Sequence, residues 1–254
     1  MSEDVTVVLS GYKRSYATLE QYQAIKNQTV KDIKIMFWVN FPDNKTNFPD
    51  EVISNSQTII SNSNYGVWGR FIESLHAQTE YVCIIDDDTI PGERWIENCI
   101  NTMKTHEGVL AARGVIINDN KKFMYPFDGS YKPLGWCGPH NTEPTRVDMG
   151  CHNWFFRRLW LRAFFAEMPA KFPMNFGEDM HLSASIKLHY GFNTYVPPHP
   201  ESDKTLWGSC PKRGGEYGQD ENAISHNGLA NLGMNKYWEY LVKQRGYKTI
   251  GESW

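Results

Sequence analysis

The sequence predicts an α/β domain in which a mostly parallel central sheet is flanked by helices. Short apolar segments rich in β-branched residues alternate with segments whose apolar residues recur every three or four positions, as strands and amphipathic helices do. The first unit comprises a strand over 5–9, a helix over 15–25 and a strand over 33–39. Such a β-α-β unit implies parallel strands. At 254 residues, the chain has the length of one such domain with insertions.

The same alternation continues along the chain. In the first half we expect a third short strand over 58–60, a helix over 67–77, a strand over 81–85, a helix opened by Pro91-Gly92 and a strand over 109–117. In the second half we expect a long loop over 118–145, a strand over 147–156, helices over 157–167 and 177–187, a short strand before Pro197 and a last helix over 236–243. We therefore predict a single domain over 1–254.

Composition narrows the possible partners only slightly. The formal net charge is −3, and basic residues occur as separated pairs, so bulk charge neither names nor excludes a nucleic acid partner. The aromatic share of 14% is high, and aromatic rings build both cores and sugar-binding surfaces. The five cysteines are odd in number and scattered, which predicts a reducing, cytoplasmic environment. We expect neither a signal peptide nor a membrane span.

The most informative motif is a run of three aspartates, Asp86-Asp87-Asp88, directly after the apolar strand Tyr81-Val-Cys-Ile-Ile85. Open α/β sheets bind ligands at the carboxyl ends of their strands. Three adjacent carboxylates repel one another unless a cation neutralises them, and Mg²⁺ and Mn²⁺ prefer such hard oxygen ligands together with phosphate oxygens. The motif therefore predicts a site for Mn²⁺ or Mg²⁺ and a diphosphate. The alternative is an ordinary acidic surface turn.

These blocks together resemble the nucleotide-binding half of GT-A glycosyltransferases. The resemblance is carried by Val5 to Leu9 with Gly11-Tyr12-Lys13-Arg14, by Gly69-Arg70-Phe71 and by Asp86-Asp87-Asp88-Thr89. It includes the inverting family 2 and, through Val147-Asp148-Met149 and Glu178-Asp179, the retaining exostosin-like enzymes. The combination is also similar to compact glycosyltransferases of bacteriophages and other large viruses, which would locate the protein in the host cytoplasm.

The resemblance implies roles for individual residues. It assigns nucleotide-sugar contacts to Gly11, Arg14, Arg70, Asp86 and Asp87, with Asp86 on the nucleoside side and Asp87 only loosely placed. It assigns the ion to Asp88. Arginine suits phosphate because its planar, permanently charged fork binds two oxygens at once. The resemblance further implies a nucleotide-sugar-binding half over 1–118 and an acceptor-binding half over 119–254.

An acidic pair, Glu178-Asp179, opens the helix predicted over 177–187. The plain interpretation is a helix cap, since the helix dipole favours negative charge there. The resemblance implies instead that the pair receives the acceptor hydroxyl, with Asp179 as general base in an inverting enzyme and Glu178 binding acceptor hydroxyls. In retaining relatives the departing phosphate oxygen can take the proton, so the stereochemistry stays open.

Further candidates lie in the second half. A histidine often completes the metal site in this class, and His199 and His226 are better placed than His152 or His181. Trp136, Trp154 and Trp207 are candidates for stacking on an acceptor sugar, although Trp154-Phe-Phe156 also fits core packing. The Gly-rich segment 208–218 is a candidate lid over the diphosphate, or a plain surface loop.

The sequence therefore predicts a metal-dependent transferase that moves a sugar from a nucleotide-diphosphate sugar, a UDP-sugar first, to an acceptor hydroxyl. The acceptor is a glycan, a protein or a hydroxymethylated base of phage DNA. Two other classes remain possible. A nucleotidyltransferase also uses strand-end carboxylates, but it would need a stronger Gly-rich basic loop than residues 10–14 provide. A non-catalytic carbohydrate-binding module fits the aromatics but not the aspartates.

Overall fold

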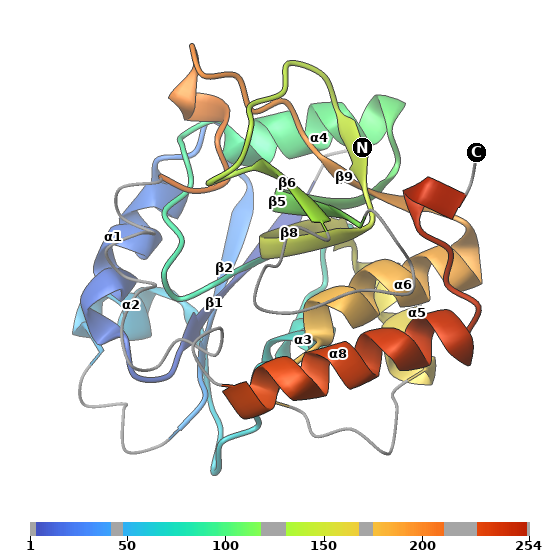
Figure 1. Ribbon diagram of the computed structural model, residues 1–254. Coiled ribbons are helices and arrows are strands. Elements are labelled where there is room, and N and C mark those ends of the chain that lie inside the picture. The colour runs from blue at the N-terminus through green and yellow to red at the C-terminus, as the bar shows by residue number, and fades with distance from the viewer. Residues whose placement is uncertain (1–3, 42–47, 118–130, 168–174, 211–227, 253–254) are drawn as a thin grey trace.

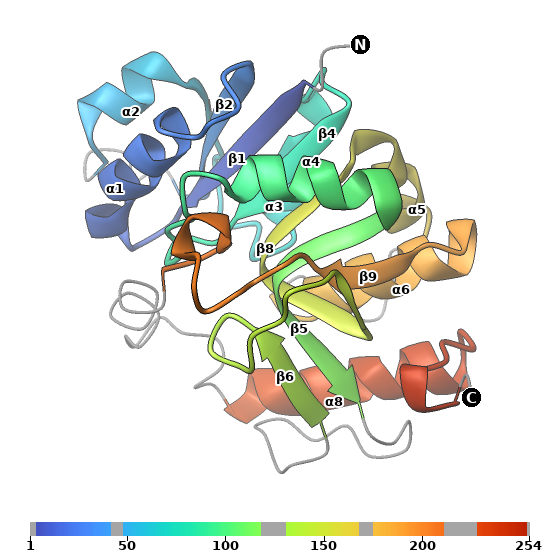
Figure 2. The ribbon, with the colours of Figure 1, turned by 90° about the horizontal axis from the view of Figure 1, so that it is seen from above.

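The computed structural model describes residues 4–41, 48–117, 131–167, 175–210 and 228–252. Nine strands of these segments form one sheet with the order β3-β2-β1-β4-β8-β5-β9-β7, and β6 pairs with β5 beside this path. Helices cover both faces of the sheet (Figures 1 and 2). The α/β architecture predicted from the alternating pattern is confirmed.

The first half of the sheet is parallel. Its strands are β1 Val5–Gly11, β2 Ile33–Val39, β3 Gln57–Ile60 and β4 Tyr81–Ile85. They are connected through α1 Ser15–Lys26, α2 Asp50–Asn55 and α3 Gly69–Glu73. Successive strands are added on one side of β1 up to β3, and the chain then returns to place β4 on the other side. This reversal at β1 and β4 opens the crevice where α/β sheets bind ligands.

The second half of the sheet is mixed. The long strand β8 Met149–Arg157 runs antiparallel between β4 and β5 Gly108–Ile117, and β9 Asn193–Val196 is parallel to β5. Of two short antiparallel strands, β6 Tyr131–Gly135 lies within the region expected to be a loop, and β7 Thr145–Val147 begins at the end of that region. The sheet is therefore less uniformly parallel than the sequence indicated.

Four more helices complete the two layers. Helix α4 Trp95–Thr105 lies on one face, and α5 Leu161–Ala166, α6 Glu178–Tyr190 and α8 Gly228–Lys243 lie on the opposite face (Figure 1). Short 3₁₀ turns occur at Ser74–His76, Arg158–Trp160, Lys204–Leu206 and Ile250–Glu252. No helix in these segments combines the length and hydropathy needed to cross a membrane.

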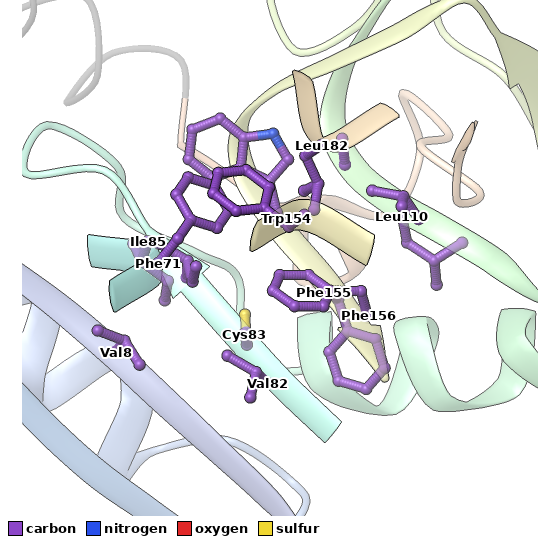
Figure 3. Packing of buried hydrophobic residues seen from close by; sticks show 14 of the residues in the cluster. Val8, Phe71, Val82, Cys83, Ile85, Leu110, Trp154, Phe155, Phe156 and Leu182 are labelled. Carbon is purple, nitrogen blue, oxygen red and sulfur yellow. The ribbon is translucent and has the colours of Figure 1, made fainter. Parts of the chain in front are cut away.

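The core is built from aromatic side chains that alternate between the two faces of β8. Trp154 packs against Phe71 of α3, whose ring also stacks on Phe164 of α5 at 4.4 Å between centroids. The ring of Phe155, on the other face, stacks on that of Tyr81. Figure 3 shows Phe71, Trp154 and Phe155 within this core. Full burial of one such ring contributes about 2–3 kcal/mol. These contacts fix α3 and the aspartate-bearing strand against β8.

The C-terminal segment is tied to the sheet through Asp148. This carboxylate is buried and accepts hydrogen bonds from the backbone amides of Ile117, at 2.8 Å, and Ile250, at 2.7 Å. The hydroxyl of Tyr247 donates to the Asp148 carbonyl at 2.5 Å. Asp148 belongs to the motif that resembles exostosin-like enzymes, and in the structure its carboxylate binds backbone amides of the fold. Burial raises its pKa.

Candidate active site

The three aspartates form a turn at the carboxyl end of β4. The Asp86 amide donates to the carbonyl of His152 on β8 at 3.0 Å, and the Thr89 amide closes the turn on the Asp86 carbonyl at 3.1 Å. Gln21 of α1 donates to the carbonyls of Asp86 and Thr89. The turn thus lies in the crevice beside the end of β1 and is held from two elements.

Asp86, Asp88 and His152 form a candidate metal centre. One ligand atom from each lies within 4.8 Å of the others. Burial and the nearby Arg113 and Arg70 guanidiniums lower the pKa of His152 to about 3, so its imidazole is neutral and able to bind a metal. Two carboxylates and one neutral imidazole fit Mn²⁺. Asp86, assigned to the nucleoside side by resemblance, therefore belongs to the cluster as well.

Arg14, at the start of α1, neutralises the other side of the turn. Its Nη1 lies 2.8 Å from Asp87 Oδ1 and 3.2 Å from Asp88 Oδ2. Burial raises the pKa of both carboxyl groups, and the Arg14 charge opposes that rise. In this position the Arg14 guanidinium could bind phosphate oxygens in place of these carboxylates.

Arg70, on α3, connects the aspartate turn to the acidic pair. Its guanidinium makes a close ion pair with Asp86, and its Nη2 lies 3.6 Å from Glu178 Oε1. The Arg70 Nε donates to the Val67 carbonyl at 2.9 Å, and its guanidinium carbon lies 5.4 Å from the centre of the Trp154 ring. One buried guanidinium therefore joins the two acidic groups that the sequence could only place separately.

Glu178 and Asp179 occupy the first turn of α6. Gly177 begins the helix in the left-handed region, with φ of 79°. Burial, reinforced by the neighbouring charge of Glu178, raises the pKa of Asp179 to about 7. Burial also raises the pKa of Glu178, while Arg70 opposes that rise. A carboxyl group that titrates near neutral pH is suited to accept a proton from a hydroxyl.

The structure does not bring every predicted residue to this site. His199 is 2% exposed and stacks on Trp207, with 4.4 Å between the ring centroids, and on His140 at 5.3 Å. The Trp207 indole donates to the Pro200 carbonyl at 2.8 Å. His199 and Trp207 thus form a packed stack apart from the candidate metal centre. His226 and residues 211–218 of the candidate lid lie outside the described residues.

The other two tryptophans differ in position. Trp154 is 1% exposed, and its indole donates to the Gly150 carbonyl, so it offers no surface to an acceptor. The ring of Trp136 lies 4.3 Å from that of His152, centroid to centroid, at the border of the cluster. Trp136 is 8% exposed and lies beside His152, whereas Trp154 packs against the Arg70 guanidinium from within the core.

Gly11 has a packing reason to be glycine. A Cβ atom there would lie 2.7 Å from the Phe48 ring and 2.9 Å from the Phe37 ring. Its carbonyl accepts a hydrogen bond from Asn40 at the end of β2. Gly11 thus lies at the crevice, but its lack of a side chain is explained by the two rings.

His152 is the residue that sequence reasoning passed over. Its φ of 71° is left-handed, a conformation that costs a non-glycine residue about 1–2 kcal/mol. The sequence does show that His152 precedes the strand residues 154–156. It does not show that this strand pairs with β4, which is what brings His152 to the aspartates. Arg113 of β5, which lies near His152, was also not singled out.

The acidic cluster lies at the switch point of the sheet, where α/β folds bind nucleotides, as the resemblance to GT-A glycosyltransferases implied. The sequence profile of Glycosyl transferase family 2 matches residues 58–165, from β3 to α5. This match covers less than half of the 254 residues and makes the chain similar to family 2 glycosyltransferases over that stretch. A search of curated protein sequences found no significant match.

Two solved structures of S. aureus TarS show the same fold. S. aureus TarS 1-349 aligns with a TM-score of 0.53 and 14% identity over 78% of this chain and 58% of its own. Its complex with UDP-GlcNAc aligns with a TM-score of 0.52 and 14% identity over 80% and 60%, respectively. The mannosyltransferase PcManGT from Pyrobaculum calidifontis, solved with GDP-Man and Mn²⁺, aligns with a TM-score of 0.48 and 14% identity over 95% and 74%. This chain spans about three fifths of TarS 1-349.

Proposed function

We propose that this domain transfers a sugar from a nucleoside diphosphate sugar to an acceptor hydroxyl. The observation that carries the proposal is the position of Arg70, which contacts both Asp86 and Glu178. Because one guanidinium reaches both groups, a donor held at the aspartate turn would have its reacting carbon near the acidic pair. The similarity of residues 58–165 to family 2 glycosyltransferases favours this reaction over nucleotidyl transfer and over sugar binding alone.

The proposed donor is a UDP-sugar. The TarS structure with UDP-GlcNAc supports testing uridine nucleotides first, because the fold is shared. The diphosphate would lie across the turn, with Arg14 and Arg70 as its cationic contacts. Each of these guanidiniums already neutralises carboxylates of the turn, so phosphate oxygens would replace one anionic partner with another.

The proposed cofactor is Mn²⁺ held by Asp86, Asp88 and His152. Bound there, the ion would act as a Lewis acid that stabilises the charge developing on the departing diphosphate. The Thr89 hydroxyl lies 3.3 Å from Asp88 Oδ1 and orients that carboxylate. Arg14 holds the other oxygen of Asp88.

Asp179 is the proposed general base of an inverting displacement. The acceptor oxygen attacks the anomeric carbon, the bond from that carbon to the diphosphate oxygen breaks, and the nucleoside diphosphate leaves with the electron pair. The acceptor proton passes to the Asp179 carboxylate. Its pKa of about 7 supports this role, because a base near neutrality is both ionised and able to hold the proton. Glu178 would keep Arg70 aligned between donor and acceptor.

The proposed acceptor is a hydroxyl group on a glycan, on a protein or on a hydroxymethylated base of DNA. These are the three acceptor classes that the sequence prediction left open. Trp136 lies beside His152 and is 8% exposed, and we propose that its exposed part contacts a sugar at the reacting end. The three acceptor classes are separated by offering each one with the donor and measuring which becomes glycosylated.

A thermal shift screen tests the proposal. UDP-, GDP-, ADP- and CDP-sugars are added to the protein with Mn²⁺ or with EDTA, because a ligand that binds only the folded state raises the melting temperature. We expect a UDP-sugar to raise it in Mn²⁺ and not in EDTA, and Asp88→Asn to abolish the rise. Stabilisation by none of the nucleotide sugars would refute the proposed donor site.

A further inference from the structure

Two buried glutamines of the α1 region face the segment that carries the aspartates. Gln21 lies within α1 and Gln28 follows its last turn, seven positions further along the chain. Their exposed fractions are 1% and 0%. A buried primary amide is costly unless it is hydrogen-bonded, so the partners of each amide identify what it stabilises.

Gln21 binds both ends of the aspartate turn. Its Nε2 donates to the Asp86 carbonyl at 2.5 Å and to the Thr89 carbonyl at 3.0 Å. Both partners are acceptors, so only the amide nitrogen can face them and the orientation of the amide is fixed. The Oε1 atom is buried and accepts no hydrogen bond in the part of the chain that the structure describes. The Gln21 amide therefore holds the two carbonyls although its own Oε1 atom lacks a hydrogen bond within the described residues.

Gln28, beyond the end of α1, binds the segment that leads into α4. Its Nε2 donates to the Gly92 carbonyl at 2.7 Å, and its Oε1 accepts from the Ile96 amide at 3.0 Å. The Ile96 amide lies in the first turn of α4, where backbone donors lack helical partners. Gln28 thus caps α4, and its hydrogen bonds in the described chain go to none of the three aspartates.

We propose that Gln21 is a positioning residue for the metal site, holding the backbone turn that sets the distance between the Asp86 and Asp88 carboxylates. The inference rests on the proposed function of that site. The carboxylates of the turn repel one another, so the turn would relax outward if its backbone were not tied. The Gln21 amide ties it at the residues that bracket Asp87 and Asp88.

The test compares Gln21→Met with Gln28→Met. Methionine retains the length of the side chain and removes the amide. Mn²⁺ binding to the full chain is measured without nucleotide, from the electron paramagnetic resonance signal of the free ion, and unfolding is measured by thermal denaturation. We expect Gln21→Met to weaken Mn²⁺ binding about 10–100-fold, as removal of a residue that orients metal ligands does. Gln28→Met should lower the melting temperature at least as much and leave Mn²⁺ binding within about twofold, since it orients no metal ligand.

The outcomes separate the inference from the proposed function. If wild-type protein binds no Mn²⁺, the proposed metal site is wrong. If it binds Mn²⁺ and Gln21→Met binds it equally well, Gln21 is structural and the inference is overturned. Gln21→Asn, whose amide is one methylene too short to span both carbonyls, serves if Gln21→Met does not fold, and we expect the same loss of Mn²⁺ binding. Failure of both Gln21 variants to fold while Gln28→Met folds also overturns the inference.

Discussion

At the scale of single residues, the site is a set of carboxylates, most of them half-buried, that are held in place by two arginines. Burial raises the pKa values of Asp87, Asp88, Glu178 and Asp179, because it penalises their charged forms. Arg14 and Arg70 offset part of that penalty from opposite sides. We propose that the same guanidiniums exchange these carboxylates for phosphate oxygens when a donor binds.

This exchange predicts opposite effects of Arg14→Met on two ligands. Without nucleotide, Mn²⁺ should bind more tightly, about tenfold, because the guanidinium no longer competes for Asp88 Oδ2. UDP in the presence of Mn²⁺ should bind more weakly, because its phosphates lose a cationic contact. Both affinities are measured by isothermal titration calorimetry.

Lys13→Met is the matched control, since it removes the neighbouring positive charge at an exposed position. It should leave both affinities within about twofold, as loss of one exposed charge does. If Arg14→Met weakens Mn²⁺ binding as well as UDP binding, the competition between guanidinium and cation is refuted.

Asp179→Asn should separate chemistry from donor binding. Loss of a general base lowers the turnover rate about 10²–10⁴-fold, whereas the affinity for the nucleotide sugar should stay the same. The kcat/KM of the wild-type enzyme should rise with pH and level off above about 7, as Asp179 ionises. Measurement of transfer from pH 5 to 9 checks both statements. Full transfer activity in Asp179→Asn would rule out the proposed base.

The raised pKa of Asp179 also has a stability consequence with a definite sign. Between its ordinary pKa of 3.8 and about 7, the folded state binds more protons than the unfolded state, so Asp179 makes stability fall as pH rises through this range. The amide that replaces the carboxyl group in Asp179→Asn does not titrate. This substitution should therefore raise the melting temperature more at pH 8 than at pH 4.5, and an equal change at both pH values would contradict the assignment.

At the scale of elements, the start of α6 determines where the acidic pair lies. Gly177 has φ of 79°, and a Cβ there would lie 2.8 Å from the Tyr237 ring of α8. Alanine should therefore destabilise the fold by about 1–3 kcal/mol and shift Glu178 and Asp179. Gly191, at the other end of the same helix, has φ of 78° with no atom within 4 Å of a Cβ.

Comparison of Gly177→Ala with Gly191→Ala thus separates two effects on activity, that of backbone strain and that of a shift of the acidic pair. Both should lower the free energy of unfolding in urea, while only Gly177→Ala should lower kcat for transfer, by at least about tenfold if the base moves by about 1 Å. A loss of kcat in Gly191→Ala as large as that in Gly177→Ala would show that overall stability, rather than the start of α6, controls activity.

Some elements could be predicted from the sequence and others could not, for local reasons. The strands β1, β2 and β4 are continuous apolar runs, and their predicted positions are confirmed. Strand β6 contains Pro133, which cannot donate to a ladder, so its segment resembled a loop. The last helix begins at Gly228, well before its predicted start, which was placed too late because glycine is a poor helix former and the segment holds Gly228 and Gly233. Gly233 lies against Phe176, so that a Cβ there would be 2.3 Å from the ring.

At the scale of the whole molecule, the candidate site combines local motifs with one long-range pairing. The aspartate turn and the acidic pair each occupy consecutive positions, so the sequence could propose them. His152 could not be ranked above the other histidines, because its position depends on β8 pairing antiparallel with β4. That pairing is decided by the packing of Trp154 and Phe156 against Phe71, which no local pattern encodes.

The central claim is that the cluster of Asp86, Asp88 and His152 and the pair Glu178 and Asp179 act in one sugar transfer. The most direct measurement is the release of UDP from UDP-sugars by the purified chain, with acceptor mixtures, in Mn²⁺ and in EDTA. We expect release in Mn²⁺, none in EDTA, and loss of release in His152→Ala as well as in Asp179→Asn. Release that is equally fast in EDTA, or undiminished in His152→Ala, would contradict it.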